Sequence, residues 1–484
     1  MAAQQGASIG VVACCRIGFG HGHPPLSRSC WRGALTAPSL RLHPTFKTTV
    51  QKLSEGALGM GTLGRAIDYR LFDADNHYYE PVDMYERYIE PAFADRTFVT
   101  RETDGGTMVL FEGRPFGFVG GRGERRRIRP GGLRAILRGE PATEDDDVDD
   151  SYASDPAARV ELMDRQGIEA TLMFPSTGVT IANAIGDDPR LLAAHMRAFN
   201  RWLADTWTFD YRQRIISPAM IVLADSDAAV AELDRVLAQG ARAIQILPGP
   251  ARWSTADGPG RSPADAVHEA FWARVNEAGV LVCLHLGNAG YMEHHSADWG
   301  EDPDPDGVRS PDGSGSTSLK GPDDPGKGRS AFQWTMLYRD RPIMDTLAIL
   351  IYHNLFGRFP NVRVASVENG SIWVPYLLRV MDNMKGMARN GPWPNGYVEG
   401  RPSEVFRNHV YVSPHHYGED VGGLVDLIGE DRVLFGSDFP HAEGMSGVGD
   451  YRDRAGELVA RIDRPDDVTS KVMRDNGLAA IGLA

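Results

Sequence analysis

The stretch LFDADNH at residues 71–77 begins with apolar residues and ends in Asp-x-His. This form is the starting point for our interpretation of the fold and the site. Two later stretches have the same form, LVCLH at 281–285 and VLFGSDFPH at 433–441. A carboxylate or imidazole at the end of a buried strand is costly unless a charged group compensates it. We therefore interpret these ends as ligands of one divalent metal ion, supplied by Asp75, His77, His285 and Asp438.

The spacing of the first pair supports this interpretation. Asp75 and His77 are two residues apart, so in a strand they lie on one face and can reach the same ion. Taken singly, each candidate has a structural alternative. Asp75 could cap a turn and His77 could be a surface imidazole with its hydrogen bonds satisfied. His285 could be a buried structural imidazole, and Asp438 could be an N-cap or a turn carboxylate. Their shared position at strand ends favours the metal site.

From residue 69 the chain alternates β-type apolar runs with amphipathic helical patterns. The predicted strands are 71–75, 170–174, 215–223, 241–247, 280–285, 362–367, 409–412 and 433–435. The predicted helices include 191–207, 228–239, 264–278, 342–356, 372–387 and 420–428. This order predicts an α/β fold, a (β/α)8 TIM barrel of the metal-dependent hydrolase type, over residues 69–484. A doubly wound open sheet is the alternative, disfavoured because no Gly-rich phosphate turn follows the first strand.

Two connections are long enough to carry structure of their own. Residues 92–150, after the first strand, contain two apolar runs around an Asp-Gly turn and predict a β-hairpin insertion. Residues 290–330, after the fifth strand, are rich in Gly, Pro, Ser and Asp, and predict a lid loop over the site.

Composition narrows the choice of partners. The net charge of -14 argues against a nucleic-acid partner, and no apolar run is long enough to cross a membrane. Four cysteines do not make a disulfide framework, which predicts a cytoplasmic protein. The first 53 residues hold six Lys or Arg and no Asp or Glu. We interpret residues 1–60 as a disordered leader, or as sequence upstream of a true start near Met60.

These motifs resemble the amidohydrolase superfamily, in particular the amidohydrolase-related family that includes aminocarboxymuconate-semialdehyde decarboxylase. Asp75-Asn76-His77 resembles the acid-x-His form of the family's first-strand motif. His285 matches its strand-five histidine, and Asp438, within GSDFPH, matches its strand-eight aspartate. The resemblance covers about residues 70–480 and implies an enzyme with a TIM barrel and a single divalent metal ion, Zn²⁺ first and Mn²⁺ second.

Two departures from the family pattern bear on the chemistry. Residues 241–247 contain no lysine, whereas binuclear relatives use a carbamylated lysine there to bridge two metals, so we expect one ion. The sixth predicted strand is followed by Glu368 where many relatives have a histidine. Glu368 is therefore a candidate base beside the metal ligands, or a partner that orients His285.

The same ligand set suits two reactions. A bound divalent ion can activate water for hydrolysis of a C–O, C–N or C–C bond, with Asp438 moving the proton. It can also bind a substrate carboxylate and stabilise the carbanion left when CO₂ departs. The resemblance favours the second reaction, a carboxy-lyase (decarboxylase) acting on a small carboxylated aromatic or unsaturated acid, and the hydrolase is the alternative. A barrel that has lost its metal and only binds is a third interpretation, which the complete ligand set argues against.

Further residues complete the predicted site. The predicted catalytic groups are Asp438, Glu368 and His441, the last as a general acid. The predicted substrate-binding residues are His415 and His416 after the seventh strand, Trp373 as a pocket wall, and Arg126 as an anion-binding group. Each could instead be a solvated loop residue or a core side chain. A small-molecule substrate is expected, and the C-terminal helices could supply a homodimer interface.

Overall fold

A computed structural model describes residues 65–103, 106–116, 129–133, 135, 150–186, 188–253, 258–288, 290–302, 330–337, 340–414 and 418–484. The predictions for residues 1–60, for Arg126, and for His415 and His416 lie outside these residues. Within these described residues the chain forms three sheets and the helices that connect their strands.

The strands form two mainly parallel sheets and a small antiparallel one. The first sheet has the order β1-β5-β7-β6, the second β12-β11-β10-β9-β8, and the third β2-β3-β4. The bounds are β1 Leu71–Tyr78, β2 Phe98–Thr103, β3 Gly106–Phe111, β4 Arg114–Pro115, β5 Ile168–Pro175, β6 Asp210–Tyr211, β7 Ile215–Ile216, β8 Ala219–Met220, β9 Ala243–Gln245, β10 Leu281–His285, β11 Arg363–Val367 and β12 Val410–Val412. Seven of the eight predicted strands overlap strands of the two parallel sheets.

The predicted strand 215–223 is divided between the two sheets. β7 pairs with β5, β8 pairs with β9, and only Ser217 and Pro218 separate β7 from β8. The eighth predicted strand, 433–435, is a connecting segment: Val433 bridges Val412 of β12 in parallel, and the backbone N–H of Ala74 in β1 donates to the Phe435 carbonyl at 2.8 Å. The last predicted strand therefore contacts both β12 and β1.

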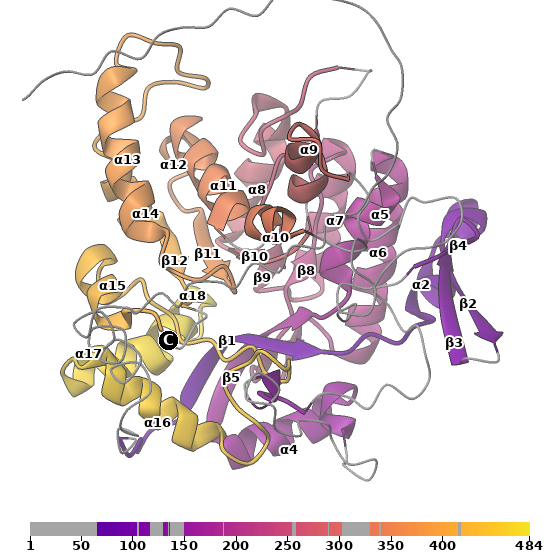
Figure 1. Cartoon of the computed structure of the whole chain (residues 1–484), viewed down its shortest axis with the longest axis horizontal. Helices are drawn as coiled ribbons and strands as arrows, with labels where there is room; N and C mark the ends of the chain where they lie inside the picture. Colours follow the sequence, from indigo (N-terminus) through magenta and orange to yellow (C-terminus); the bar gives the residue numbers. More distant parts are fainter. Residues whose placement is uncertain are drawn as a thin grey trace, which may run out of the picture. The chain divides into compact units, whose positions relative to one another are not determined.

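Helices occupy the connections between the parallel strands and surround them (Figure 1). Their bounds are α2 Met84–Tyr88, α4 Pro156–Gln166, α5 Ile181–Ile185, α6 Pro189–Thr206, α7 Ser226–Ala238, α8 Glu269–Ala278, α9 Tyr291–Ala297, α10 Ala331–Leu337, α11 Asp340–Tyr352, α12 Leu355–Arg358, α13 Val374–Met387, α14 Pro402–His409, α15 Val421–Ile428, α16 Tyr451–Ile462, α17 Asp466–Ser470 and α18 Asn476–Ala480. Short turns are η1 Pro91–Arg96, η2 Ser151–Ala153, η3 Gly178–Thr180, η4 Ala266–His268 and the π-type η5 Lys471–Asp475.

Several helices begin at an aspartate that caps free backbone N–H groups. Asp155 accepts from the N–H groups of Ala157 and Ala158, while Asp188 and Asp225 do the same for α6 and α7. Such caps stabilise a helix start by about 1 kcal/mol each. The sequence pattern located α6 and α7 to within a few residues, because amphipathic periodicity is a local signal, and α4 was not among the predicted helices.

The apolar side chains divide into two cores. Alternate strand residues such as Phe72, Ala170 and Leu281 face one another in an inner core, to which Leu478 of α18 contributes. The other strand face packs against the surrounding helices in a larger outer core. Strands that are buried on both faces explain the continuous apolar runs of the sequence.

The two long connections are partly described. β2 and β3 pair antiparallel within the predicted insertion 92–150, from Phe98 with Phe111 to Thr103 with Gly106. In the predicted lid, α9 lies directly after β10 and residues 303–329 are outside the described part.

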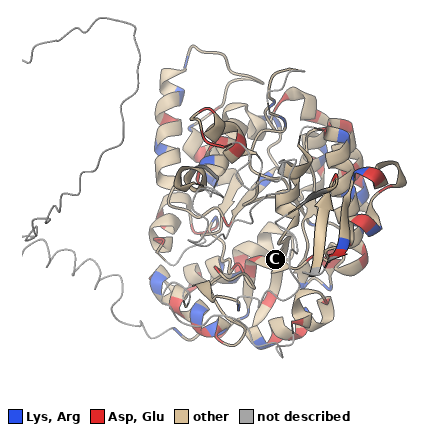
Figure 2. Ribbon diagram, turned by 45° about the vertical axis from the view of Figure 1, so that its right-hand side comes forward, with Lys and Arg blue, Asp and Glu red and all other residues tan. Residues whose placement is uncertain are grey.

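None of the described helices combines the length and apolar character that crossing a membrane requires. Figure 2 shows Lys and Arg interspersed with Asp and Glu over the outer helices.

A glycine at the start of α18 provides a test of the packing. A Cβ on Gly477 would overlap the ring of Phe72, which is itself buried. We expect Gly477→Ala to destabilise the protein by about 1–3 kcal/mol through overpacking, measured as a lower midpoint of urea unfolding. Gly386→Ala in α13 is the control, because no described residue beyond its own helix turn lies within 4 Å of the added Cβ; it should be stabilising by about 0.5–1 kcal/mol. Equal midpoints for the two variants would contradict the packing.

Candidate metal centre

A β-bulge in β1 directs ligand-type side chains toward the inner core. Phe72 pairs with Ala170 and His77 pairs with Phe174, so β1 has one residue more than β5 between these pairs. The extra residue shifts the alternation of side chains between the two faces. His77 consequently lies on the inner side with Phe174, at a ring-centroid distance of 6.3 Å.

The other candidate ligands come from the ends of different strands. His285 is the last residue of β10, and Glu368 directly follows β11. Asp438 lies three residues beyond the segment 433–435. Glu368 and Asp438 have positive φ angles of 62° and 56°. A left-handed backbone at a residue other than glycine costs about 1–3 kcal/mol and is concentrated at functional sites.

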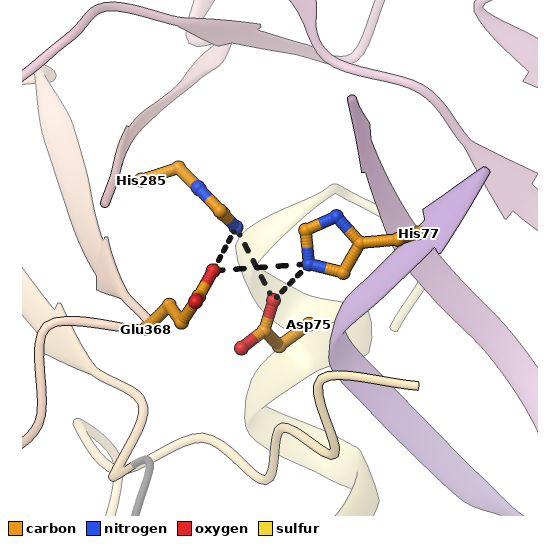
Figure 3. Close-up of side chains that lie close together, drawn as sticks. All are labelled: Asp75, His77, His285 and Glu368. Carbon is orange, nitrogen blue, oxygen red and sulfur yellow. Dashed lines mark ion pairs between the residues drawn. The ribbon is translucent and has the colours of Figure 1, made fainter. Parts of the chain in front are cut away.

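Four buried side chains converge at the carboxyl ends of β1, β10 and β11 (Figure 3). One ligand atom from each of Asp75, His77, His285 and Glu368 lies within 4.8 Å of the others. His285 Nε2 is 3.0 Å from Glu368 Oε2 and 3.4 Å from Asp75 Oδ1. His77 Nε2 is 3.3 Å from Asp75 Oδ1 and 3.8 Å from Glu368 Oε2. Asp438 adjoins the group, with Oδ1 3.2 Å from His77 Nε2.

Backbone contacts set the tautomers of the two histidines. His285 Nδ1 is 2.8 Å from the Leu286 carbonyl, and His77 Nδ1 is 3.3 Å from the Pro175 carbonyl. Because a carbonyl oxygen only accepts, each Nδ1 carries the proton that it donates. Each Nε2 therefore turns toward the carboxylates as the nitrogen that can bind a cation or a second proton.

The electrostatics of the group show a shortage of positive charge. Burial and the nearby Asp438 raise the pKa of Glu368, and burial raises the pKa of Asp438 to about 7. Burial lowers the pKa of His285, but Glu368 and Asp75 outweigh it and raise this pKa to about 10. The carboxylates thus draw a proton onto His285 Nε2 when no other cation is present.

The residues fit a divalent metal ion. Among the described residues, His77 Nε2, His285 Nε2 and Asp438 Oδ2 are buried with no hydrogen-bond partner. Buried polar atoms are almost always satisfied, so convergent unsatisfied ones indicate a missing partner. Imidazole nitrogens with carboxylate oxygens are the donor set of Zn²⁺ and Mn²⁺. One cation at this position would satisfy these atoms and compensate the carboxylates together.

A buried carboxylate outside this group fixes the position of Asp438. Asp73 accepts hydrogen bonds from the backbone N–H of Ser437 at 3.0 Å and from the Ser437 hydroxyl at 2.5 Å. It also accepts from the Tyr451 hydroxyl at 2.6 Å and from the Asn76 side-chain amide at 2.6 Å. Hydrogen bonds to a charged group contribute about 1.5–3 kcal/mol each. Asp73 thereby joins β1 to the segment that carries Asp438.

Arg159 of α4 extends the same network. Its guanidinium is fully buried and donates to the side-chain oxygen of Asn76 and, at 2.8 Å, to the backbone carbonyl of His77. The guanidinium also lies 5.0 Å from the ring centroid of Phe439. Burial lowers the pKa of Arg159 to about 10, which leaves it positively charged at neutral pH. The Arg159 guanidinium therefore joins β1 to the segment 433–439.

Comparison with known proteins places this site in a family. The sequence model named Amidohydrolase matches residues 72–483, which include every ligand candidate. The chain belongs to the amidohydrolase family. An amidohydrolase from Mycobacterium avium subsp. paratuberculosis K-10 is 32% identical, with a TM-score of 0.69, over 86% of this chain and 100% of that chain. The resemblance inferred from the motifs is confirmed, and the protein is an enzyme.

More distant structures share the fold of this amidohydrolase. The 2,6-dihydroxybenzoate decarboxylase from Rhizobium is 17% identical, with a TM-score of 0.51, over 86% of this chain and 99% of that chain. A point mutant of 5-carboxyvanillate decarboxylase from Novosphingobium aromaticivorans, with bound manganese, is 15% identical, with a TM-score of 0.52, over 86% of this chain and 98% of that chain. Among curated proteins, none matches the sequence.

The fold of this chain brings most of the predicted site residues together. Asp75, His77, His285 and Glu368 form the four-residue group. Glu368 is therefore itself a candidate ligand, in addition to being a partner that could orient His285. Asp438 groups with His77 and His441, and its Oδ1 is 2.6 Å from His441 Nδ1. The role of each residue stays a prediction.

Trp373 occupies a different kind of position. Its indole N–H donates to the carbonyls of Asn369 and Gly370 at 3.1 and 2.9 Å, at the start of α13. Its side chain is buried near Phe406. These contacts secure the turn after β11, and the substrate contact predicted for Trp373 stays a prediction.

Sequence reasoning missed the residues of the supporting network. Asp73 offered a signal, because it is a second carboxylate within a fully buried strand. Arg159 offered none, since an arginine in an amphipathic helix is normally solvated. The contacts of both join segments far apart in the sequence.

The Tyr451 hydroxyl gives a direct test of this network. We expect Tyr451→Phe to lower the free energy of unfolding by about 1.5–3 kcal/mol, because one hydrogen bond to a buried carboxylate is lost. Tyr376→Phe is the control, since that side chain is 64% exposed and should change stability by less than about 0.5 kcal/mol. Urea unfolding of both variants measures the difference, and indistinguishable midpoints would refute the contribution of Tyr451.

Proposed function

We propose that this amidohydrolase is a mononuclear metal-dependent decarboxylase that acts on a small carboxylated aromatic or unsaturated acid. The observation that carries the proposal is the buried group of Asp75, His77, His285 and Glu368 with Asp438 beside it. The similar folds of two aromatic acid decarboxylases support the choice of reaction.

We also infer that the parallel strands close into a (β/α)8 barrel. The pairing runs from β1 through β5 to β7, continues from β8 to β12, and reaches the segment 433–439. That segment bonds back to β1, where Asn76 bridges Phe439 in parallel. Closure would place the ligand residues at the carboxyl ends of the strands, where TIM-barrel enzymes have their active sites.

The metal ion that these residues would hold acts, when bound, as a Lewis acid for a substrate carboxylate and an adjacent oxygen. We propose Asp75, His77, His285 and either Glu368 or Asp438 as its ligands. Zn²⁺ and Mn²⁺ are the candidates, and one of the structures of similar fold contains manganese.

Asp438 and His441 can supply the proton that decarboxylation requires. Decarboxylation breaks a C–C bond, releases CO₂ and leaves an electron pair on carbon that must take up a proton. Asp438 Oδ2 has no hydrogen-bond partner among the described residues and is the atom we propose to deliver this proton. His441, when its imidazole is doubly protonated, can return a proton from Nδ1 to Asp438 Oδ1, which is 2.6 Å away.

A hydrolase is the second candidate. The same Asp438 oxygen could accept a proton from attacking water in place of donating one, because a carboxyl group beside the reacting atoms can act as a general base or as a general acid. The two reactions use the same side chains and differ in their products. The proposed homodimer and the contributions of Arg126, His415 and His416 rest on the sequence alone.

Metal content tests the site independently of any substrate. Protein purified without added metal or chelator should contain about one equivalent of a divalent ion by elemental analysis. His285→Ala and His77→Ala should each lose it, because each removes an unsatisfied buried nitrogen. His353→Ala, at a half-buried histidine of the loop after α11, is the matched control and should retain it. Wild-type protein without metal even after reconstitution with Zn²⁺ or Mn²⁺ would refute the proposal.

Product analysis distinguishes the two reactions. We expect the metal-loaded enzyme to release CO₂ from a member of a panel of hydroxybenzoates and unsaturated dicarboxylic acids. Asp438→Asn should lower kcat by about 10²–10⁴-fold because the proton donor is lost. Manometry or a coupled assay measures the release of CO₂. Esters and lactones are assayed in parallel. Turnover of the esters or lactones without CO₂ release from any acid would decide for the hydrolase.

A further inference from the structure

His441 lies in a chain of polar contacts that extends the site beyond Asp438. His441 Nδ1 is 2.6 Å from Asp438 Oδ1, and His441 Nε2 is 3.0 Å from the hydroxyl oxygen of Ser176. Ser176 directly follows β5 and its hydroxyl donates to the carbonyl of Tyr78 at 2.7 Å. The chain thus links the ends of β1 and β5 to Asp438.

The hydrogen-bond roles along this chain follow from chemistry. A hydroxyl has one proton, and the Tyr78 carbonyl can only accept it. The Ser176 oxygen is then the acceptor toward His441, so His441 Nε2 is the donor. With Nε2 held by Ser176, the opposite ring nitrogen, Nδ1, faces the carboxylate of Asp438.

Ring packing restricts the same imidazole. The rings of His441 and His77 lie 3.9 Å apart with an interplanar angle of 32°. This tilted ring contact limits movement of the His441 ring out of its plane but does not select which nitrogen faces Asp438. The contact with Ser176 makes that selection.

A serine, a histidine and an aspartate at these distances also resemble a nucleophilic triad. Such a triad needs free backbone N–H groups near the serine to stabilise an oxyanion. Here the N–H groups of Ser176, Thr177 and Gly178 all donate to the carboxylate of Glu80, at 2.8 to 3.3 Å. The proton of the Ser176 hydroxyl is also directed away from His441. The local geometry therefore opposes a nucleophilic serine.

We infer that Ser176 is a positioning residue that fixes the orientation of the His441 imidazole and, through it, presents a nitrogen to Asp438. This inference rests on the proposed function, in which Asp438 moves the proton. It assigns a role in the site to the turn after β5.

Kinetics of two hydroxyl deletions in one turn test the inference. Ser176→Ala should lower kcat by about 10–100-fold, as expected when a partner that orients a functional group is lost. KM and metal content should stay within about twofold of wild type, and Ser176→Thr, which keeps a hydroxyl, should recover most of kcat. Thr180→Ala is the control, because its hydroxyl donates to the Thr177 carbonyl at 2.8 Å in the same turn. An unchanged kcat in Ser176→Ala, or an equal loss in both alanine variants, would overturn the inference.

A crystal structure of Ser176→Ala gives a readout that needs no substrate. The His441 ring should be rotated or disordered, with its Nδ1 no longer within hydrogen-bond distance of Asp438. A ring in the wild-type position would overturn the inference even if the proposed reaction is correct. Absence of turnover by wild-type enzyme would instead count against the proposed function alone. Labelling of Ser176 by a fluorophosphonate, which displaces fluoride only with an activated hydroxyl, would show a nucleophile and overturn the positioning role.

Discussion

The backbone ladder between β1 and the segment 433–439 is the interaction on which the site depends. Ala74 N–H donates to Phe435, Asp438 N–H donates to Asp75, and His77 N–H donates to Phe439, each at 2.8 Å. This ladder brings together ligand candidates from the two ends of the described chain. A shift in its register would separate Asp438 from His77, because side-chain direction alternates along extended backbone.

Asp73 and Arg159 explain why that register is stable. Asp73 binds both the backbone and the hydroxyl of Ser437, and Arg159 binds carbonyls of β1 while its guanidinium lies over Phe439. Both charges are buried, and each would cost several kcal/mol without such partners. Their opposite charges and their many hydrogen bonds offset this cost and restrict β1 and the 433–439 segment to one arrangement.

The site shows the reverse situation, in which burial is not fully compensated. Glu368, Asp75 and Asp438 lie within a few ångströms of two imidazoles whose Nε2 atoms have no hydrogen-bond partner among the described residues. The strained backbone at Glu368 and Asp438 adds to the cost. Proteins retain such arrangements where a bound cation and a reaction make use of them. Buried charge is thus compensated by hydrogen bonds in the supporting network, and it is left for a bound cation to compensate in the candidate metal centre.

The sequence by itself determined the family, the order of most strands and of six helices, and the residue types of the candidate metal site. These follow from local signals, namely apolar strands that end in Asp, His or Glu and the amphipathic periodicity of helices. The tertiary structure alone decided that Glu368 lies among the candidate ligand atoms, that Asp73 and Arg159 hold β1 to the segment 433–439, and that Ser176 contacts His441. The physical reason is that each of these contacts joins segments far apart in the sequence. Its strength depends on small differences in distance and angle, which no local pattern in the sequence encodes.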